Sequence, residues 1–365
     1  MDGTKDIMTI NDILYKAVKQ QASDIIIIAG LPVSYKTGGR IYHDNSDKLL
    51  PSHTQVLLEE IYCLANGRSM ETLLKHGDDD FSFSLPQLSR FRVNALKQRG
   101  SLGSVIRVVS FDLPDYHELH IPEAVMKFAL YTKGMVLVTG PAGCGKSTTL
   151  ACLIDSINHQ RNAHIITIED PIEYLHRHAQ SVVTQRELSS DTDSYEKALR
   201  AALRQAPDVI LLGEMRDYET IKAAITAAET GHLLISTLHT IGTVNTIDRI
   251  IDSFPPTQQQ QIRVQLGMVL QGVISQQLVP TIAGGVMPAF EIMIANNAIR
   301  NLIRETKAHQ IESVIYSAAG EGMITMDTYL FNMVKSAQIA AAEAIHYSSN
   351  NEQMQKRLAG AGLNI

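Results

Sequence analysis

The sequence predicts an α/β protein in which a small α+β domain precedes a larger domain built on a parallel sheet and extended by helices. Two patterns lead to this fold class. Between about residues 135 and 240, apolar β-prone runs alternate with helical segments, as in a parallel sheet with crossover helices. Before residue 110, short strands instead follow one another as in hairpins. A length of 365 residues suits two domains.

Composition restricts the class of protein. Hydrophobic residues make up 45% and charged residues 19%, which indicates an ordered chain with a sizeable core. A net charge of −6 argues against a protein that mainly grips nucleic acid. Cys63, Cys144 and Cys152 lack the spacing of a zinc site or a disulfide framework. The first ten residues carry no apolar signal segment, and the apolar runs are too short to span a bilayer, so we expect a cytoplasmic protein without a transmembrane segment.

Residues 1–109 are expected to form the small domain. Its expected elements are helices over 7–22 and 52–65 and strands over 25–28, 81–85, 90–95 and 101–109. Strands 81–85 and 90–95 are expected to face each other in a hairpin. Asp78-Asp79-Asp80, just before that hairpin, is interpreted as a solvated turn. Residues 110–120 show no clear period and are interpreted as an interdomain linker.

Residues 121–283 are expected to form the larger domain, which opens with a helix beginning at Pro122. The expected elements that follow are strands over 135–139, 164–168, 209–213 and 233–237 and helices over 148–154, 194–204 and 219–230. After residue 260 the pattern is mostly helical, with a break at Gly284-Gly285. Residues 284–365 are therefore expected to form a helical C-terminal region.

A glycine-rich loop of the form G-x-x-x-x-G-K-S joins the first of these strands to its helix. The loop consists of Gly140, Pro141, Ala142, Gly143, Cys144, Gly145, Lys146 and Ser147, and Thr148 continues it. Glycines let backbone amides close around a β-phosphate, and the helix N-terminus adds positive potential. Lys146 can reach the β- and γ-phosphates, and Ser147 can bind Mg²⁺. The sequence therefore predicts ATP and Mg²⁺ as cofactors.

Acids at the strand ends are candidates for hydrolysis, because ligands of open α/β sheets bind at that edge. Glu214 closes strand 209–213 and is expected to bind Mg²⁺ through water. An aspartate usually precedes such a glutamate, but Gly213 stands there, so the base is sought elsewhere. Glu173 is the candidate to orient the attacking water, with Glu169 and Asp170 as rivals.

Two histidines flank strand 233–237. His239 follows its carboxyl end, which favours a role in sensing the γ-phosphate. His232 precedes its amino end, and a structural role is as well supported there as nucleotide binding. We carry His232 as a candidate nucleotide-binding residue.

Five ordered blocks between about residues 20 and 330 resemble the PilT type of secretion-superfamily ATPase. The matching blocks are a Walker A motif at 140–147, an Asp box at 167–174, a Walker B motif at 210–217, a His box within 229–240 and a C-terminal retraction motif at 298–305. The chain departs from the family in its first strand, where Ser23-Asp24-Ile25-Ile26-Ile27 lacks the usual histidine. It also lacks the tetracysteine zinc element of the pilus-extension relatives.

The resemblance implies a PAS-like N-terminal domain, a RecA-like P-loop ATPase domain and a homo-hexameric ring. It implies a motor that retracts type IV pili in twitching motility, and an inner-membrane pilus platform protein as partner. The motor would then act at the inner face of the cytoplasmic membrane. The base of the family's Asp box falls on Glu173, in agreement with the choice made from the residues.

Arginines are expected to supply further positive charge to the phosphates. Arg204 and Arg216 lie in the ATPase core, although Arg216 could pair with Asp217. Arg92 and Arg107 lie on adjacent strands of the small domain. The alternative to a catalytic role is that both arginines are simply solvent-exposed at a strand edge. In the family that this chain resembles, however, this strand pair faces the nucleotide cleft. The resemblance therefore favours Arg92 and Arg107 as catalytic groups of an interdomain or intersubunit site.

Two other functions compete with retraction. One is an ATPase of a related type II/IV secretion or conjugation system, which block 298–305 disfavours, although Ile299, Leu302 and Ile303 in it also have ordinary core spacing. The other is a RecA-like nucleic-acid translocase, which the acidic balance disfavours, so no nucleic-acid partner is expected. An inactive scaffold conflicts with the full set of candidate catalytic residues.

Overall fold

A computed structural model describes residues 8–44, 46–109, 111 and 113–363. Contacts divide the chain into two compact units, Met1–Asp112 with Ile172–Leu175 and Leu113–Pro171 with His176–Ile365. Within the predicted linker 110–120, residues 110 and 112 lie outside the described residues. Leu113, Tyr116 and Leu119 pack against the core of the second unit.

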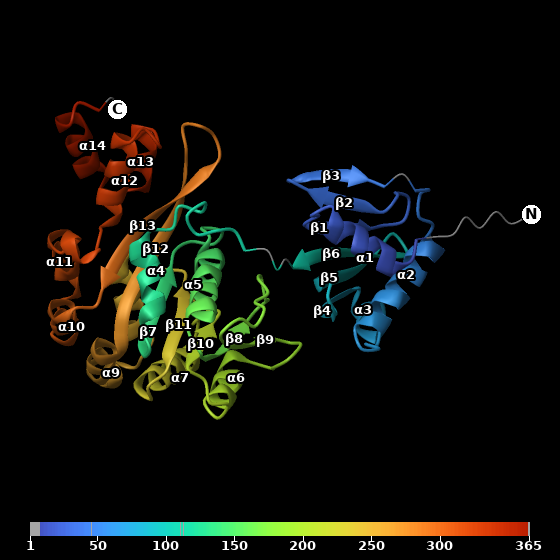
Figure 1. The fold of residues 1–365 in the computed structure, drawn as a ribbon, viewed down its shortest axis with the longest axis horizontal. Helices are drawn as coiled ribbons and strands as arrows, with labels where there is room; N and C mark the ends of the chain where they lie inside the picture. Colours follow the sequence, from blue (N-terminus) through green and yellow to red (C-terminus); the bar gives the residue numbers. More distant parts are fainter. Residues whose placement is uncertain (1–7, 45, 110, 112, 364–365) are drawn as a thin grey trace, which may run out of the picture. The chain divides into compact units, whose positions relative to one another are not determined.

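The first unit is built on a six-stranded antiparallel sheet in the order β3-β2-β1-β6-β5-β4. The strands are β1 (Asp24–Ile27), β2 (Ser34–Thr37), β3 (Arg40–His43), β4 (Asp78–Leu85), β5 (Ser89–Gln98) and β6 (Ser101–Val109), and the helices are α1 (Ile10–Lys19), α2 (Pro51–Leu64) and α3 (Glu71–His76). The helices pack on one face of this sheet (Figure 1). Phe91 and Val93 of β5 belong to the core on that face. Arg92, between these two, points to the other face because side chains alternate along a strand.

The interpretation of Asp78–Asp80 as a solvated turn is wrong. Strand β4 begins at Asp78, and alternation directs Asp79 to the helix-covered face, where it is 5% exposed. Arg68 donates to both carboxylate oxygens of Asp79, at 2.8 and 3.0 Å, and the Tyr62 hydroxyl donates at 2.9 Å. Burial, and then the hydrogen bond to Asp79, raise the pKa of Tyr62. A buried carboxylate needs such partners, and both come from residues far outside the run of acids.

The second unit is built on a seven-stranded sheet in the order β13-β12-β7-β11-β10-β8-β9, in which β13 alone is antiparallel to its neighbour. The strands are β7 (Gly134–Thr139), β8 (His164–Glu169), β9 (Val182–Glu187), β10 (Val209–Leu212), β11 (Leu233–Leu238), β12 (Leu270–Pro280) and β13 (Val286–Ile294). Short helix α4 (Glu123–Met126), followed by a 3₁₀ turn over Lys127–Leu130, packs with α5 (Lys146–Gln160) on one face.

The core on the opposite face of this sheet includes residues of α6 (Tyr195–Ala202), α7 (Tyr218–Glu229), α8 (Thr243–Asp252) and α9 (Pro256–Val269). Strand β7 lies between these two layers of helices (Figure 1). It contributes to both cores, since Met135 and Leu137 belong to the core with α6–α9 while Val136 and Val138 belong to the core with α5. The alternation of strands and helices predicted between 135 and 240 is therefore confirmed. Strands β2, β3 and β9 were not anticipated.

The expectation of helix after residue 260 is wrong for residues 270–294. There β12 and β13 form an antiparallel hairpin, with Gly284 and Gly285 in its turn. Most of β12 is buried on both faces, so it has no period-2 pattern to distinguish it from a buried helix. The predicted helical region 284–365 consequently begins with a strand.

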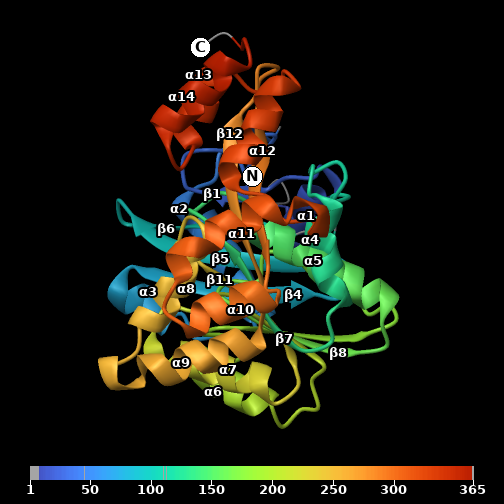
Figure 2. The ribbon, with the colours of Figure 1, turned by 90° about the vertical axis from the view of Figure 1, so that its left-hand side faces the viewer.

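Helices follow from Asn297 onward. They are α10 (Asn297–Arg304), α11 (Ile311–Ser317), α12 (Met326–Lys335), α13 (Ala341–Tyr347) and α14 (Asn351–Gly360), with 3₁₀ turns over Ala308–Gln310 and Ala319–Glu321. Figure 2 shows α12, α13 and α14 grouped together, and they share a core with Val279 of β12 and Ala289 of β13. Among the described residues, no helix combines the length and apolarity that a membrane span requires.

Candidate nucleotide site

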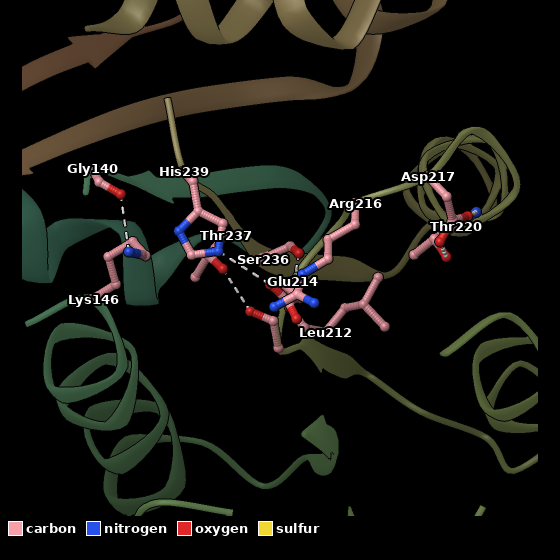
Figure 3. A network of polar contacts seen from close by, with 11 residues as sticks. Gly140, Lys146, Leu212, Glu214, Arg216, Asp217, Thr220, Ser236, Thr237 and His239 are labelled. Atoms are coloured by element: carbon pink, nitrogen blue, oxygen red, sulfur yellow. Dashed lines mark hydrogen bonds and ion pairs between the residues drawn. The ribbon is translucent and has the colours of Figure 1, made fainter. Parts of the chain in front are cut away.

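The glycine-rich loop joins β7 to α5 at the carboxyl edge of the second sheet. Gly140 has a φ of +142°, and a Cβ on it would lie 2.2 Å from the carbonyl oxygen of Gln276. The Lys146 side chain is buried, and its Nζ donates to the Gly140 carbonyl at 2.9 Å (Figure 3). It also donates to the Pro141 carbonyl at 2.8 Å. These contacts hold a cation inside a loop that leads into a helix N-terminus, which is the arrangement expected for binding phosphate.

Gln276 of β12 is a part of the site that sequence reasoning missed. Its side chain is 3% exposed. Its Nε2 donates to the Cys144 carbonyl at 2.7 Å, and its Oε1 accepts from the Thr149 hydroxyl at 2.7 Å. The amide thus fixes the loop to the first turn of α5. The polar trio Ser275-Gln276-Gln277 inside an apolar run was the available signal, but that run was interpreted as helix.

Glu214 follows β10 at the same edge, with its side chain 13% exposed. Its Oε2 accepts from Arg216 Nε at 2.6 Å and lies 3.2 Å from His239 Nε2 (Figure 3). The suggested pairing of Arg216 with Asp217 is wrong, because Asp217 instead caps α7 by accepting from the Thr220 amide at 2.8 Å. A carboxylate, a guanidinium and an imidazole therefore meet at the ends of two adjacent strands.

Two buried hydroxyls hold the turn that carries Glu214. Thr237 donates to the Gly213 carbonyl at 2.6 Å, and Ser236 donates to the Leu212 carbonyl at 2.7 Å (Figure 3). The structure also explains why glycine, and not aspartate, precedes Glu214. A Cβ on Gly213 would lie 2.9 Å from the Tyr195 hydroxyl and 3.2 Å from the Ile168 carbonyl.

Tyr195, at the start of α6, is a second neighbour of the acids that sequence reasoning did not identify. Burial raises the pKa of its phenol, and the negative charge of Glu214 raises it further. The phenol therefore stays protonated, which makes it a hydrogen-bond donor at this edge of the sheet. Nothing in the local sequence distinguished it from a core tyrosine.

The two histidines lie at opposite edges of the sheet. His239 follows the carboxyl end of β11, beside Glu214. His232 precedes the amino end of β11, and its Nδ1 lies 3.1 Å from the Ala227 carbonyl of α7 and 3.1 Å from the Thr230 hydroxyl. A six-residue strand therefore separates His232 from the edge that carries the glycine loop of its own chain. A role of His232 in nucleotide binding stays a prediction.

The acids after β8 differ in their environment. Glu169 ends β8 and accepts from the Thr167 hydroxyl at 2.7 Å and from the Gln185 side-chain amide at 3.3 Å. Asp170 and Glu173 are exposed, and Glu173 belongs to the segment Ile172–Leu175 that groups with the first unit. The role of Glu173 as the base stays a prediction.

The donor set suits a magnesium ion bound mainly through phosphates and water. Ser147 is the second residue of α5, so its hydroxyl belongs to the loop that receives the phosphates. Among the described residues, no three His, Cys, Asp or Glu side chains group as metal ligands. Mg²⁺ in nucleotide sites keeps several waters and takes one or two protein oxygens, so Ser147 and a water-bridged Glu214 fit it. Thr148 follows Ser147 in the same turn.

The two arginines of the first unit are directly opposite each other on β5 and β6. Arg107 is 65% exposed, and its Nε donates to Asp24 of β1 at 3.0 Å. Arg92 is half-buried on the same open face. Their role in catalysis stays a prediction, as does the family's use of that face.

Comparisons with known proteins identify the family of this chain. The family model "Type II/IV secretion system protein" matches residues 2–360. The chain is 43% identical over 337 residues to the type IV pilus retraction ATPase PilT of Pseudomonas aeruginosa, covering 92% of this chain and 97% of that protein. It is 49% identical over 276 residues to a twitching motility protein of Neisseria gonorrhoeae, covering 75% and 74% of the two chains.

A solved structure of the pilus retraction motor PilT with bound ADP is similar to this fold. The two structures superpose with a TM-score of 0.86 at 42% identity, covering 96% of this chain and 100% of the other. Sequence and structure therefore agree over nearly the whole length. The chain belongs to the Type II/IV secretion system protein family.

Proposed function

We propose that this chain is an ATP-hydrolysing motor that powers type IV pilus retraction and twitching motility. One observation carries the proposal: the Lys146 loop and the Glu214–His239 pair lie at one edge of a parallel sheet. Its similarity to PilT of Pseudomonas aeruginosa along nearly the full chain supports retraction as the work performed.

The residues at this edge divide the reaction between them. The loop amides and Lys146 bind the phosphates, and Ser147 with a water-bridged Glu214 would hold Mg²⁺. When bound, the ion would supply positive charge to the phosphate oxygens. Glu173 orients the attacking water. His239, which contacts Glu214, senses the γ-phosphate, and its position then sets the position of the turn that follows it.

The remaining parts of the proposal concern assembly. A homo-hexameric ring would let Arg92 and Arg107 approach the nucleotide of a neighbouring subunit or their own. An inner-membrane pilus platform protein would receive the work, with the ring acting from the cytoplasm at the inner face of that membrane. Deleting the gene and imaging surface pili tests the direction of work, since accumulated pili support retraction and lost pili contradict it.

The assignment of the base is tested by two isosteric changes. We expect Glu173→Gln to bind ATP without hydrolysing it, because an amide can keep the packing but is a poor base. Glu214→Gln is the comparison, measured by steady-state hydrolysis and by nucleotide binding. Normal turnover of Glu173→Gln together with an inactive Glu214→Gln would move the base to Glu214.

The retraction motif needs variants chosen from the structure. Arg300 donates to the carbonyls of Gly267 at 2.8 Å, Met268 at 2.9 Å and Ala295 at 2.8 Å, so it holds α9 to α10. Arg304, one turn later, is exposed. We therefore expect Arg304→Ala to keep ATP hydrolysis while retraction fails. Arg300→Ala is expected to lower stability instead. Loss of ATP hydrolysis in purified Arg304→Ala would show that this helix is structural.

A further inference from the structure

A single buried carboxylate in the second unit caps two helices. Glu291 of β13 is 6% exposed. Its Oε1 accepts from the Thr243 amide at 2.7 Å, and its Oε2 accepts from the Met326 amide at 3.3 Å. Thr243 and Met326 are the first residues of α8 and α12. Each oxygen of Glu291 therefore holds the N-terminus of a different helix.

The α8 end of this link belongs to the nucleotide edge. Helix α8 begins four residues after His239, and the Gly242 amide just before it donates to Ser275 Oγ of β12 at 2.9 Å. In its first turn, Thr246 Oγ1 donates to Thr139 Oγ1 at 3.4 Å. Thr139 is the last residue of β7, immediately before the glycine loop. A displacement of residues 239–242 would therefore move the first turn of α8, whose Thr243 amide is hydrogen-bonded to Glu291.

The α12 end of the link belongs to the C-terminal helices. Ile292, next to Glu291, exchanges backbone hydrogen bonds with Ile324 at 2.8 and 3.1 Å, which fixes the approach to α12. Within the helical group, Asp327 of α12 accepts from the Ser349 amide at 2.6 Å, between α13 and α14. Met326 and Leu330 share the core of this group with Met354 and Leu358 of α14. Displacement of Met326 is thus transmitted to α13 and α14.

Capping alone does not account for Glu291. Helix α12 already has its own N-cap, because Thr325 Oγ1 accepts from the Thr328 amide at 3.2 Å. A buried carboxylate is costly unless hydrogen bonds compensate it, and a neutral side chain would cap α8 at lower cost. A carboxylate differs from such a cap in having two acceptor oxygens, which can serve two helix N-termini at once.

We propose that Glu291 is a positioning residue that couples the nucleotide-dependent position of the His239–Thr243 turn to helices α12–α14. The proposal rests on the proposed function, namely that the chain binds and hydrolyses ATP. The coupling is mechanical, because the N-termini of α8 and α12 are both hydrogen-bonded to one side chain on β13 and would move together with it. It assigns to the C-terminal helices a response to the nucleotide, although they supply no residue to the glycine loop.

Hydrogen exchange on the unmodified protein tests the coupling directly. Backbone exchange of residues 243–246 and 326–329 is followed with no nucleotide, with ADP and with a non-hydrolysable ATP analogue. We expect both segments to change protection together between the three states. If the α8 segment responds and the α12 segment does not, the coupling is refuted. If bound nucleotide changes neither segment, it is refuted as well. Failure of ADP and the analogue to bind would instead refute the proposed function.

Two isosteric variants separate coupling from stability. Glu291→Gln keeps one acceptor oxygen but turns an N–H donor toward the other helix amide, so one of the two links is lost. We expect its α12 response to ADP, and its kcat, to fall at least about fivefold, with KM for ATP unchanged. Glu352→Gln changes an exposed position of α14 outside both exchange segments, and it is expected to keep both values.

A merely structural role gives a different result. It would lower the melting temperature of Glu291→Gln while leaving the α12 response and kcat of the folded fraction at the parent values, and this result would refute the proposal. If Glu291→Gln does not fold, the exchange pattern of the unmodified protein decides alone.

Discussion

The two sheets of this protein place their charged residues in different ways. The antiparallel sheet of the first unit has helices on one face, so Arg92 and Arg107 lie in a cross-strand row on the other. The mostly parallel sheet of the second unit is covered on both faces (Figure 1). Lys146, Glu214 and His239 therefore lie at the carboxyl edge of its parallel strands. A sheet that is covered on both faces can expose reactive side chains only at its strand ends. A sheet that is covered on one face can expose them along its whole open face.

The largest expected effect is at the covered sheet's edge. Lys146→Ala removes the cation that the loop carbonyls hold, so we expect ATP hydrolysis to be lost and nucleotide binding to weaken. Phosphate release and ADP binding measure the two effects. Lys197→Ala is the matched control, because Lys197 is exposed and pairs with Asp193 on the surface of α6. Hydrolysis by Lys146→Ala near the parent rate would contradict the whole assignment of this edge.

The next effect tests whether the open face has a catalytic role. We expect Arg107→Ala to lower turnover on the order of 10³-fold, with much less effect on nucleotide affinity, as for loss of an arginine finger. Arg40→Ala, on edge strand β3 of the same sheet, is the control. Parent rates in both Arg92→Ala and Arg107→Ala would show that the finger lies in the ATPase core.

Mixing variants shows which subunit supplies the arginine. An Arg107→Ala chain keeps the loop lysine, and a Lys146→Ala chain keeps the arginine. Restored hydrolysis in the mixture would show that Arg107 acts across a subunit boundary. A mixture as inactive as its components would place the arginine beside the nucleotide of its own chain.

The smallest effect compares the two faces of the first sheet. Asp79 is buried against Arg68, which is itself 39% exposed. We expect Asp79→Ala to lower the free energy of unfolding by about 2–3 kcal/mol, somewhat less than for a fully buried pair, because solvent compensates part of the guanidinium. Asp80→Ala, on the open face, is expected to change it by no more than about 0.5 kcal/mol. Denaturant unfolding measures both, and equal losses would contradict the distinction between the faces.

Local pattern was sufficient for the parts of the site that are contiguous in sequence. The glycine loop could be identified because its spacing and its flanking strand and helix are all adjacent. The positions of Glu214 and His239 followed because parallel strands end at a common edge. The row of Arg92 and Arg107 followed from two adjacent antiparallel strands.

Tertiary structure alone decided the contacts that join distant segments. Gln276 holds a loop more than a hundred residues before it, and Glu291 joins helices on either side of it in sequence. Strand β12 lacks a period because it is buried on both faces, so its side chains carried no local sign of their partners. The environment of Asp79 could not be predicted from its neighbours in sequence for the same reason, since Arg68, which compensates its charge, lies outside strand β4. Periodicity records which face of an element is buried, but the partner on that face is set by packing between elements that the sequence separates.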